Sequence, residues 1–422
     1  MKRRRLLLAA MGLGAGFAAW KFWPEEGLWN SCRPLPLPKH LANHEIVRAA
    51  WADLDAVKVW DVHVHLSGLG VGNSRVWVNP AMRSVFHPFE FVHTQFYANA
   101  ACMTNRTEAS ADAYVARLTA LQQERPLGAK LLLLAMDYFH DEAGNRNPAR
   151  TVFYVPNDYA AEIAIQHAAR LEWIASIHPY RADCIEALEW ATSHGARAVK
   201  WIPSAMGIDP ASPRCDPFYA ALTRLDMPLL SHGGYEHPLL NSGALQELNN
   251  PLALRRPLEH GVRVIVAHCA STGSGIDTDR GIHGPEVENF SLFSRLMDDP
   301  RYDGRLVGDI SALTESTRVG PLLRYVLKRT DWHGRLLNGS DYPLPGYVPE
   351  VSIKRLVNQD FITSTQGRVL GELRQHDPLL FDFVLKRHIA ADGTRFAASV
   401  FETAGFFNRG SDRPPISVVR AR

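Results

Sequence analysis

The stretch Val59-Trp-Asp-Val-His-Val-His-Leu66 decides the fold. It belongs to a β-branched and aromatic run that begins at Val57 and ends at Ser67-Gly68, which is typical of a buried parallel strand that passes into a loop. His63 and His65 are separated by one residue, so a strand places both imidazoles on the same face, where they can bind one metal ion. With 18 histidines in the chain, such a pair can also arise by chance. The rest of the sequence must decide between the two readings.

Seven further apolar, β-rich stretches follow this one along the chain. They span Lys130 to Asp137, Trp173 to His178, Ala196 to Trp201, Met227 to His232, Val262 to His268, Leu306 to Ser311, and Leu336 to Asp341. Stretches with apolar residues at helical spacing lie between them, at Asp158 to Arg170, Arg181 to Ser193, Pro217 to Leu225, Glu286 to Met297 and Gly320 to Thr330. This alternation predicts a parallel sheet with helices outside, and eight strands close an α/β (β/α)8 TIM barrel. Extra helices are expected after the last strand.

The chain divides into four predicted segments. Residues 1–23 are expected to be an export signal or membrane anchor, because Lys2-Arg3-Arg4-Arg5 precedes Leu6 to Trp20, which carries no charge. Residues 24–50 follow as a linker, residues 51–390 as the barrel and residues 391–422 as a C-terminal tail. The first segment predicts a bacterial-type cell envelope protein, periplasmic or anchored in the inner membrane. Whether this segment is cleaved stays open.

Composition limits the classes of partner. Of 422 residues 46% are hydrophobic and 21% charged, the net charge is +2, and basic residues beyond the N-terminus are scattered among acidic ones. We therefore expect a small-molecule substrate and no nucleic acid, with membrane contact only through an uncleaved N-terminus; a homodimer stays open. Five widely spaced cysteines without a CxxC pair predict ordinary core or surface residues and no disulfide framework. These are Cys32, Cys102, Cys184, Cys215 and Cys269.

Polar residues interrupt the apolar runs where the strands end. They include Asp61, His63 and His65 on the first strand, His178 and Arg181 after the third, Lys200 on the fourth, His232 on the fifth, His268 on the sixth, Asp309 and Ser311 on the seventh, and Asp341 on the eighth. In a barrel these ends face one mouth. Imidazoles and carboxylates that converge there suit zinc, manganese or iron.

This order of residues resembles the amidohydrolase superfamily: His-x-His on strand one, Lys on four, His on five, His on six and Asp on eight. The closer similarity is to the amidohydrolase-related group that contains aminocarboxymuconate-semialdehyde decarboxylase. Gly339-Ser-Asp-Tyr-Pro343 and Asp377-Pro-Leu-Leu-Phe381 are similar to segments of that group. The resemblance covers roughly residues 55 to 390.

The resemblance implies a divalent metal site, with zinc as the first choice and one or two ions. His63, His65 and Asp341 would bind the first ion, with His232 as a further ligand if there is one metal. With two metals, a carbamylated Lys200 would bridge them, and His232 and His268 would hold the second. Asp341 would act as general base toward metal-activated water, and with one metal His268 would be free as acid, base or electrophile.

Lys200 favours hydrolysis, because the decarboxylase-like members of the group lack a lysine at this position. The alternative is an ordinary amine that pairs with Asp341 or with a substrate carboxylate. Arg181 and His178 are candidates for substrate binding, although an arginine at the start of a helix is more often part of an outer salt bridge. Asp61 is either an acceptor for an imidazole N–H or a cap at the strand start.

Two groups lie further from the predicted chemistry. His237, His140 and Tyr342 are expected in the substrate wall. The long segment from Ser67 to Gly128 is expected to fold partly over the mouth as a lid or substrate wall; the alternative is an inert surface insertion.

The predicted function is hydrolysis of an amide, ester or lactone bond in a small organic substrate. The first alternative is a metal-dependent nonoxidative decarboxylase of an aromatic or unsaturated carboxylic acid, which would release carbon dioxide without consuming water. The second is a non-catalytic, metal-bound envelope protein. The combination of His268 and Asp341 argues against the second, since a scaffold needs neither.

Overall fold

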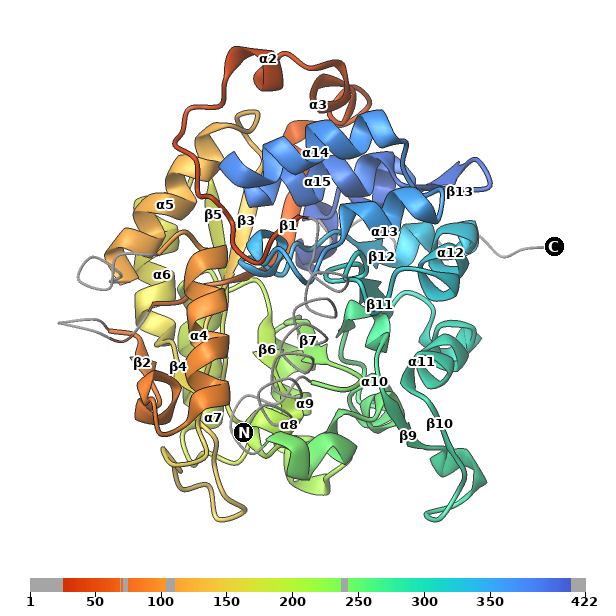
Figure 1. Cartoon of the computed structure of the whole chain (residues 1–422). Helices are drawn as coiled ribbons and strands as arrows, with labels where there is room; N and C mark the ends of the chain where they lie inside the picture. Colours follow the sequence, from red (N-terminus) through yellow and green to blue (C-terminus); the bar gives the residue numbers. More distant parts are fainter. Residues whose placement is uncertain (1–25, 69, 71–74, 104–110, 237–241, 411–422) are drawn as a thin grey trace, which may run out of the picture.

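The computed structural model describes residues 26–68, 70, 75–103, 111–236 and 242–410, and Figure 1 shows strands at the centre with helices around them. Eight parallel strands form this centre. They are β1 (Trp60–His65), β3 (Lys130–Leu134), β5 (Leu171–Ile174), β6 (Val199–Trp201), β7 (Leu229–His232), β8 (Val264–Ala267), β11 (Leu306–Asp309) and β12 (Leu336–Leu337). Each lies within a predicted stretch or overlaps it, so the sequence located all eight.

The strands form a three-stranded sheet, β1-β3-β5, and a five-stranded sheet, β12-β11-β8-β7-β6. Single parallel bridges join the two sheets at both seams: Ala175 pairs with Val199, and Val64 pairs with Tyr342. At the second seam the His65 backbone N–H donates to the Tyr342 carbonyl at 3.0 Å. The strands therefore follow one another in chain order as predicted, although two sheets joined by bridges replace one continuous ladder.

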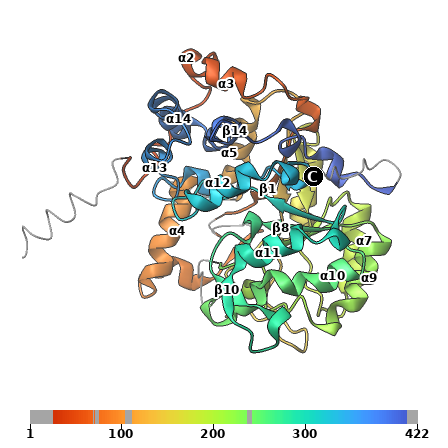
Figure 2. The same cartoon turned by 90° about the vertical axis from the view of Figure 1, so that its right-hand side faces the viewer.

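Helices connect consecutive strands on the outside of the sheets, as expected for parallel neighbours. They are α4 (Pro88–Ala100) and α5 (Ala111–Gln123) before β3, α6 (Asn157–Gln166), α7 (Cys184–Ser193), α8 (Pro203–Met206), α9 (Asp216–Arg224), α10 (Arg255–Glu259), α11 (Asn289–Met297) and α12 (Pro321–Lys328). Three more follow β12, namely α13 (Ile353–Asn358), α14 (Ser364–His376) and α15 (Pro378–His388). The predicted extra C-terminal helices are thus present (Figures 1 and 2).

Three short antiparallel strand pairs, two of them hairpins, lie outside the central strands. Antiparallel pairs form between β2 (Trp77–Val78) and β4 (Phe153–Tyr154), and between β9 (Ser274–Ile276) and β10 (Glu286–Glu288). The third pair is β13 (Ala390–Ala391) with β14 (Thr394–Arg395). The helix predicted from Glu286 therefore begins only at Asn289, because the three preceding residues pair as a strand.

A bulge in β1 decides which side chains enter the interior. The pairing with β3 runs Asp61 to Leu131 and then Val64 to Leu133, so β1 has one extra residue between these two pairs. Trp60 and Val62 consequently belong to the cluster inside the ring of strands, whereas Val64 belongs to the outer core beneath the helices. The bulge lets one strand supply core at its start and ligands at its end.

The opposite, N-terminal end of the strands is closed by the C-terminal part of the chain. Phe406 and Phe407 join the inner cluster, and the Phe407 ring centroid lies 6.1 Å from that of Trp60. Residues that the sequence assigned to a tail of uncertain order thus cover the base of the ring up to Gly410.

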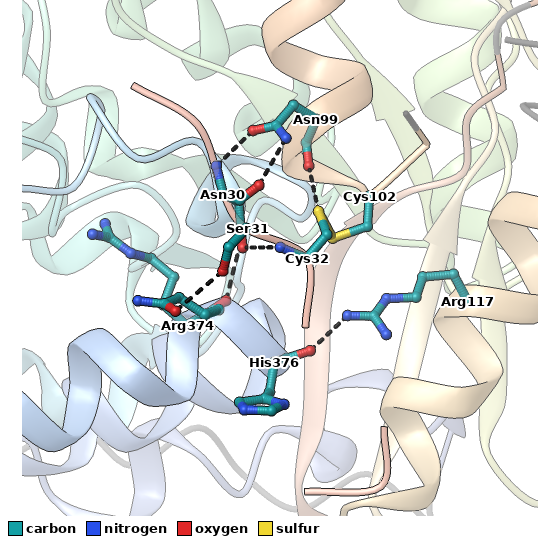
Figure 3. Close-up of a disulfide and its surroundings, with 9 residues drawn as sticks. Asn30, Ser31, Cys32, Asn99, Cys102, Arg117, Arg374 and His376 are labelled. Atoms are coloured by element: carbon teal, nitrogen blue, oxygen red, sulfur yellow. Dashed lines mark hydrogen bonds between the residues drawn. A yellow bond between two sulfur atoms is a disulfide. The ribbon is translucent and has the colours of Figure 1, made fainter. Parts of the chain in front are cut away.

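The predicted linker is attached to the body at several points. It contains α2 (Lys39–Ala42) and α3 (Glu45–Ala49), and Glu26 pairs with Arg374 of α14 at 2.5 Å. Figure 3 shows the centre of this attachment, where Asn30 and Asn99 exchange hydrogen bonds beside a disulfide between Cys32 and Cys102. This segment is therefore part of the folded body.

The disulfide corrects the prediction that all five cysteines are ordinary residues. Cys32 and Cys102 lie 70 residues apart in sequence, yet their Cα atoms are 5.5 Å apart. A separation of this size in the sequence does not predict which cysteines pair. The prediction holds for Cys184, Cys215 and Cys269, which are free and buried. The predicted signal or anchor, residues 1–23, lies outside the described residues. Within the described part of the chain, no helix combines the length and the apolar character needed to cross a membrane.

Candidate metal centre and its cavity

Three predicted ligands meet at the C-terminal ends of β1 and β12. The Nε2 atoms of His63 and His65 lie 3.5 Å and 3.1 Å from Oδ1 of Asp341. One donor atom from each of the three lies within 4.8 Å of the other two, which is close enough to surround one ion. The structure therefore brings His63, His65 and Asp341 together as a candidate metal centre.

A second group adjoins the first through His63. Asp309, at the end of β11, places Oδ2 2.9 Å from Nδ1 of His63, and His268, after β8, places Nε2 3.8 Å from Oδ2 of Asp341. His63, His268 and Asp309 again have donor atoms within 4.8 Å of one another. The two groups share His63, so a single cluster occupies the mouth.

Asp309 and Ser311 determine how the two imidazoles are oriented. The Ser311 hydroxyl donates to Asp309 and lies 2.8 Å from Nδ1 of His268, while Asp309 also accepts the His268 backbone N–H at 3.0 Å. Nδ1 of each imidazole therefore donates, to Asp309 from His63 and to Ser311 from His268. This leaves the Nε2 lone pair of both rings directed at Asp341, as metal-binding or basic imidazoles require. Asp309 and Ser311, which the sequence placed at the end of the seventh strand, thus contact the candidate ligands.

Burial and mutual charge set the ionisation of the cluster. Burial lowers the pKa of both His63 and His268. Burial by itself would raise the pKa of Asp341, but the neighbouring His63 and His268 outweigh it and the pKa lies well below its ordinary value. Neutral imidazoles beside an ionised carboxylate are the forms that bind a divalent cation.

The backbone is strained where the ligands sit. Asp341 and His268 have φ values of 59° and 55°, a left-handed conformation that costs about 1–3 kcal/mol for a residue other than glycine. Gly339 packs so closely that an added Cβ would lie 2.7 Å from Cβ of His63. Strained conformations of this kind are retained where function depends on the position of a side chain.

Lys200 and His232 complete the predicted ligand set in different ways. Lys200 of β6 is fully buried, and its Nζ lies 3.3 Å from Nε2 of His63. Burial lowers its pKa, although Asp309 and Asp341 act in the opposite direction. His232 of β7 also lines the cavity, but its Nε2 lies 3.0 Å from Oε2 of Glu236 and belongs to neither three-residue group.

Glu236 is a site residue that sequence reasoning missed. It lines the cavity, and burial would raise its pKa, yet the adjacent His232 lowers it to about 2. Its position four residues after His232, in the loop after the same strand end, was the available signal. Its carboxylate therefore adds a second negative charge to the cavity beside that of Asp341.

The ligands line a cavity of about 150 Å³ whose walls are mostly apolar. The β1–β3 connection supplies Val78, Met82, Tyr97, Ala98 and Met103, which confirms that this long segment folds over the mouth. Further apolar lining comes from Val152, Phe153, Ile202, Pro343 and Leu344. Among the described residues that line the cavity, Lys200 is the one lysine or arginine.

The two predicted substrate-binding residues lie elsewhere. Arg181 pairs with Asp137 at 2.9 Å and with Asp183 at 2.6 Å, which is the outer salt bridge considered as its alternative. His178 is buried, with Nε2 3.0 Å from the Met206 carbonyl. Neither residue lines the cavity, because each side chain is held by these hydrogen bonds and ion pairs, and we propose no substrate contact for either.

The described residues among the weaker candidates support the backbone or lie away from the cavity. Oδ1 of Asp61 accepts the backbone N–H groups of His63 and Ser340, so this carboxylate supports the backbone at the ligands and accepts no imidazole N–H. His140 and Tyr342 are buried and do not line the cavity, so their predicted place in the substrate wall is not observed. His237 lies outside the described residues.

A protein-family model described as "Amidohydrolase" matches residues 60–361, well over half of the chain. No curated protein matches this chain. Among solved structures, a probable 2-pyrone-4,6-dicarboxylic acid hydrolase from Acinetobacter baumannii is 14% identical with a TM-score of 0.39, over 75% of this chain and 99% of that one. A 5-carboxyvanillate decarboxylase from Sphingomonas paucimobilis is 12% identical with a TM-score of 0.43, over 76% and 98%. Such low structural scores do not discriminate between the two activities.

Proposed function

The chain belongs to the amidohydrolase family and is an enzyme of that superfamily, and from this premise we propose that it is a metal-dependent hydrolase of a small, neutral organic molecule. The bond cleaved is an amide, ester or lactone. Zinc is the first candidate for the ion, and the framework is a closed (β/α)8 barrel. The observation that carries the proposal is the convergence of His63, His65, His268 and Asp341 on one apolar cavity.

The residues present fit a divalent ion. The Nδ1 atoms of His63 and His268 are engaged by Asp309 and Ser311, so the Nε2 lone pairs of both rings face the Asp341 carboxylate. A cation bound between these groups and His65 would satisfy all of them. An ion bound there would lower the pKa of a coordinated water molecule toward about 7 and would thereby supply a nucleophile at neutral pH.

Two side chains handle the protons of the reaction. Asp341 is the proposed general base, because its second oxygen, Oδ2, faces His268 while Oδ1 faces His63 and His65. With one ion bound, His268 would be the acid for the leaving group, because its Nδ1 is bound to Ser311 and its Nε2 lies 3.8 Å from Oδ2 of Asp341; with a second ion bound, Nε2 is a ligand and Asp341 returns the proton instead. Asp309 and Ser311 keep both imidazoles in the required orientation.

Lys200 is proposed to hold a second ion as a carbamate. Its amine is fully buried beside His63, and among the described residues no carboxylate lies within 4.0 Å of it. A buried amine without a counterion is unfavourable, whereas its carbamate offers two oxygens to neighbouring ions. His232 and His268 line the same part of the cavity and are the proposed ligands of the second ion.

The cavity favours hydrolysis over decarboxylation. Decarboxylation of an aromatic acid requires a site for an anion, and proteins bind carboxylates preferentially with arginine. Outside the proposed metal ions the described lining has no arginine, and its two carboxylates, Asp341 and Glu236, oppose an anionic substrate. The apolar walls suit an uncharged substrate of small size instead.

The proposal is tested with purified, zinc-loaded protein in ¹⁸O-labelled water against neutral esters, lactones and amides, and against aromatic carboxylic acids. We expect one ¹⁸O atom in the acid product of a neutral substrate and no released carbon dioxide. Asp341→Asn should lower the rate by about 10²- to 10⁴-fold, as loss of a general base does. Carbon dioxide release without ¹⁸O incorporation would instead identify a decarboxylase, and unchanged function in Asp341→Asn would contradict catalysis at this site.

A further inference from the structure

An apolar surface lies at the start of α4 and in the turn before it. Phe86 is 90% exposed, Phe89 86%, Val85 68% and Val92 49%. Other exposed large apolar residues, such as Leu127, Ile165 and Ile282, are far from these four in sequence. We call the four residues the α4 patch. Four large apolar side chains within eight residues form the kind of concentration that marks an interaction surface.

Helix α4 is apolar on two sides. Its inner side, with Thr94, Tyr97 and Ala98, lines the cavity of the candidate site. Phe89, Val92 and Phe96 follow one another at spacings of three and four residues on the other side. A helix that is apolar on both sides is normally buried on both. On the outer side of α4, Trp29 and Tyr347 stack on Phe96, whereas Phe89 and Val92 are left exposed.

We propose that the α4 patch docks on a lipid bilayer, so that the wall of the active-site cavity lies at the membrane surface. The N-terminal sequence points to the same partner. Leu6 to Trp20 carries no charge and follows four consecutive basic residues, Lys2 to Arg5. Such a segment enters the membrane, with its cations at the lipid headgroups.

Chain length then restricts where the bilayer is. Five residues lie between Trp20 and Glu26, and each of the six steps of an extended chain spans at most about 3.6 Å, so Glu26 lies within about 22 Å of the end of the apolar segment. Glu26 is held to the body by its ion pair with Arg374. The bilayer and the folded body are therefore neighbours at this point.

The described N-terminus is fixed directly to α4. The Trp29 ring stacks on that of Phe96 at 4.7 Å, and Asn30 exchanges hydrogen bonds with Asn99. The Cys32–Cys102 disulfide closes the same contact just beyond the end of α4 (Figure 3). Trp29 is itself 52% exposed and extends the patch toward the point at which the chain arrives. The segment that would enter the bilayer and the surface that would rest on it thus share one side of the molecule.

The disulfide gives independent support for a location outside the cytoplasm. Disulfides persist in oxidising compartments such as the periplasm and are rare in the cytosol. This agrees with an envelope protein whose body faces the periplasm. Resting on the proposed function, the surface also assigns a substrate class: neutral molecules soluble in lipid, which reach the apolar cavity beside α4.

The docking surface is tested with a fluorescent label on a single cysteine in the full chain. The three free cysteines are buried and the other two are bonded, so an introduced thiol is labelled selectively. Phe89→Cys carries the label on the patch, and Ile282→Cys, at 83% exposure, is the matched control. The protein is reconstituted into phosphatidylethanolamine and phosphatidylglycerol vesicles that contain a nitroxide-labelled phospholipid.

We expect the lipid quencher to reduce the fluorescence at position 89 at least about twofold more than at position 282. Equal quenching at the two positions would overturn the proposal. Self-quenching between labels at position 89 in detergent, without quenching by lipid, would show a contact between two copies and would also overturn it. Shielding of the label from water before reconstitution would show that the chain covers its own patch.

A second measurement separates this proposal from the proposed function. Phe86→Ser/Phe89→Ser should leave hydrolysis of a water-soluble substrate unchanged and lower the rate on a vesicle-dissolved substrate by on the order of 10-fold. Equal rates on the vesicle-dissolved substrate would contradict a docking role. If no substrate is hydrolysed at all, the proposed function fails, while the quenching measurement still decides the docking surface.

Discussion

Lys200 and Lys386 are both fully buried, yet the protein surrounds them in opposite ways. Lys386, on α15, donates to Asp382 and to the Gly339 carbonyl, each at 2.6 Å. Lys200, at the mouth, lies against the His63 imidazole at 3.3 Å and has no described carboxylate within 4.0 Å. A buried cation with a full set of acceptors stabilises a fold, whereas one without them costs stability and is retained for chemistry. The difference separates the scaffold lysine from the site lysine.

The largest expected effect concerns the scaffold lysine. Lys386→Met leaves the Asp382 carboxylate buried without its cation, so we expect the free energy of unfolding to fall by about 3–5 kcal/mol at pH 8. Urea unfolding measures this loss. Lys386→Met/Asp382→Leu removes both charges and should recover most of it; a loss below about 1 kcal/mol in the single variant would remove the contrast between the two lysines.

The Asp382 carboxyl should also make stability depend on pH. Burial raises its pKa to about 7, although Lys386 acts against this. Between pH 3.8, the ordinary pKa of this carboxyl, and pH 7, the unfolded chain has released the proton while the folded chain still keeps it. The free energy of unfolding therefore falls as pH rises through this window and becomes constant at higher pH. We expect a contribution of a few kcal/mol at most. Urea unfolding from pH 4 to 8 should show this slope in the wild type and its absence in Asp382→Asn; equal slopes would contradict the assignment.

Lys200→Met should produce the reverse pattern. Without a carboxylate to strand, the metal-free variant should unfold at an unchanged or higher urea concentration than the metal-free wild type. The activity of the metal-loaded variant should fall by on the order of 10²-fold or more, beyond the effect of losing a supporting group. Elemental analysis of protein prepared with bicarbonate should find two metals per chain in the wild type and one or none in the variant. One metal in both proteins would refute the carbamate, and a loss of stability equal to that of Lys386→Met would place Lys200 in the scaffold.

The smallest effect is expected at the carboxylate that holds His63 beside Lys200. Asp309→Asn removes the charge 2.9 Å from Nδ1 of His63, and metal affinity should fall by about 10- to 100-fold. Equilibrium dialysis against zinc measures the change. Ser311→Ala, which removes a neutral hydroxyl from the same network, should have a smaller effect; an unchanged affinity in Asp309→Asn would show that His63 is positioned by packing alone.

Much of the fold and of the candidate site follows from local sequence. The eight strands are recognisable as short apolar runs, and Lys200, His232, His268 and Asp341 interrupt or end such runs at positions where a parallel sheet places side chains at one edge. Arg181 shows the limit of this logic. It also follows a strand, but Asp137 and Asp183 neutralise it away from the cavity, and its partners are known only once the strands are assembled.

By itself, the sequence determined the order of the strands and the residues at their ends, because hydrophobic periodicity is a local property. Tertiary structure alone decided the bulge in β1 that separates Val62 from Val64 and the Cys32–Cys102 bond. It also decided that both lysines are buried and that Lys200 has no carboxylate within 4.0 Å among the described residues. The physical reason is that strand pairing, charge compensation and burial depend on distances between residues that are far apart in the sequence. The spacing of residues along the chain does not give these distances.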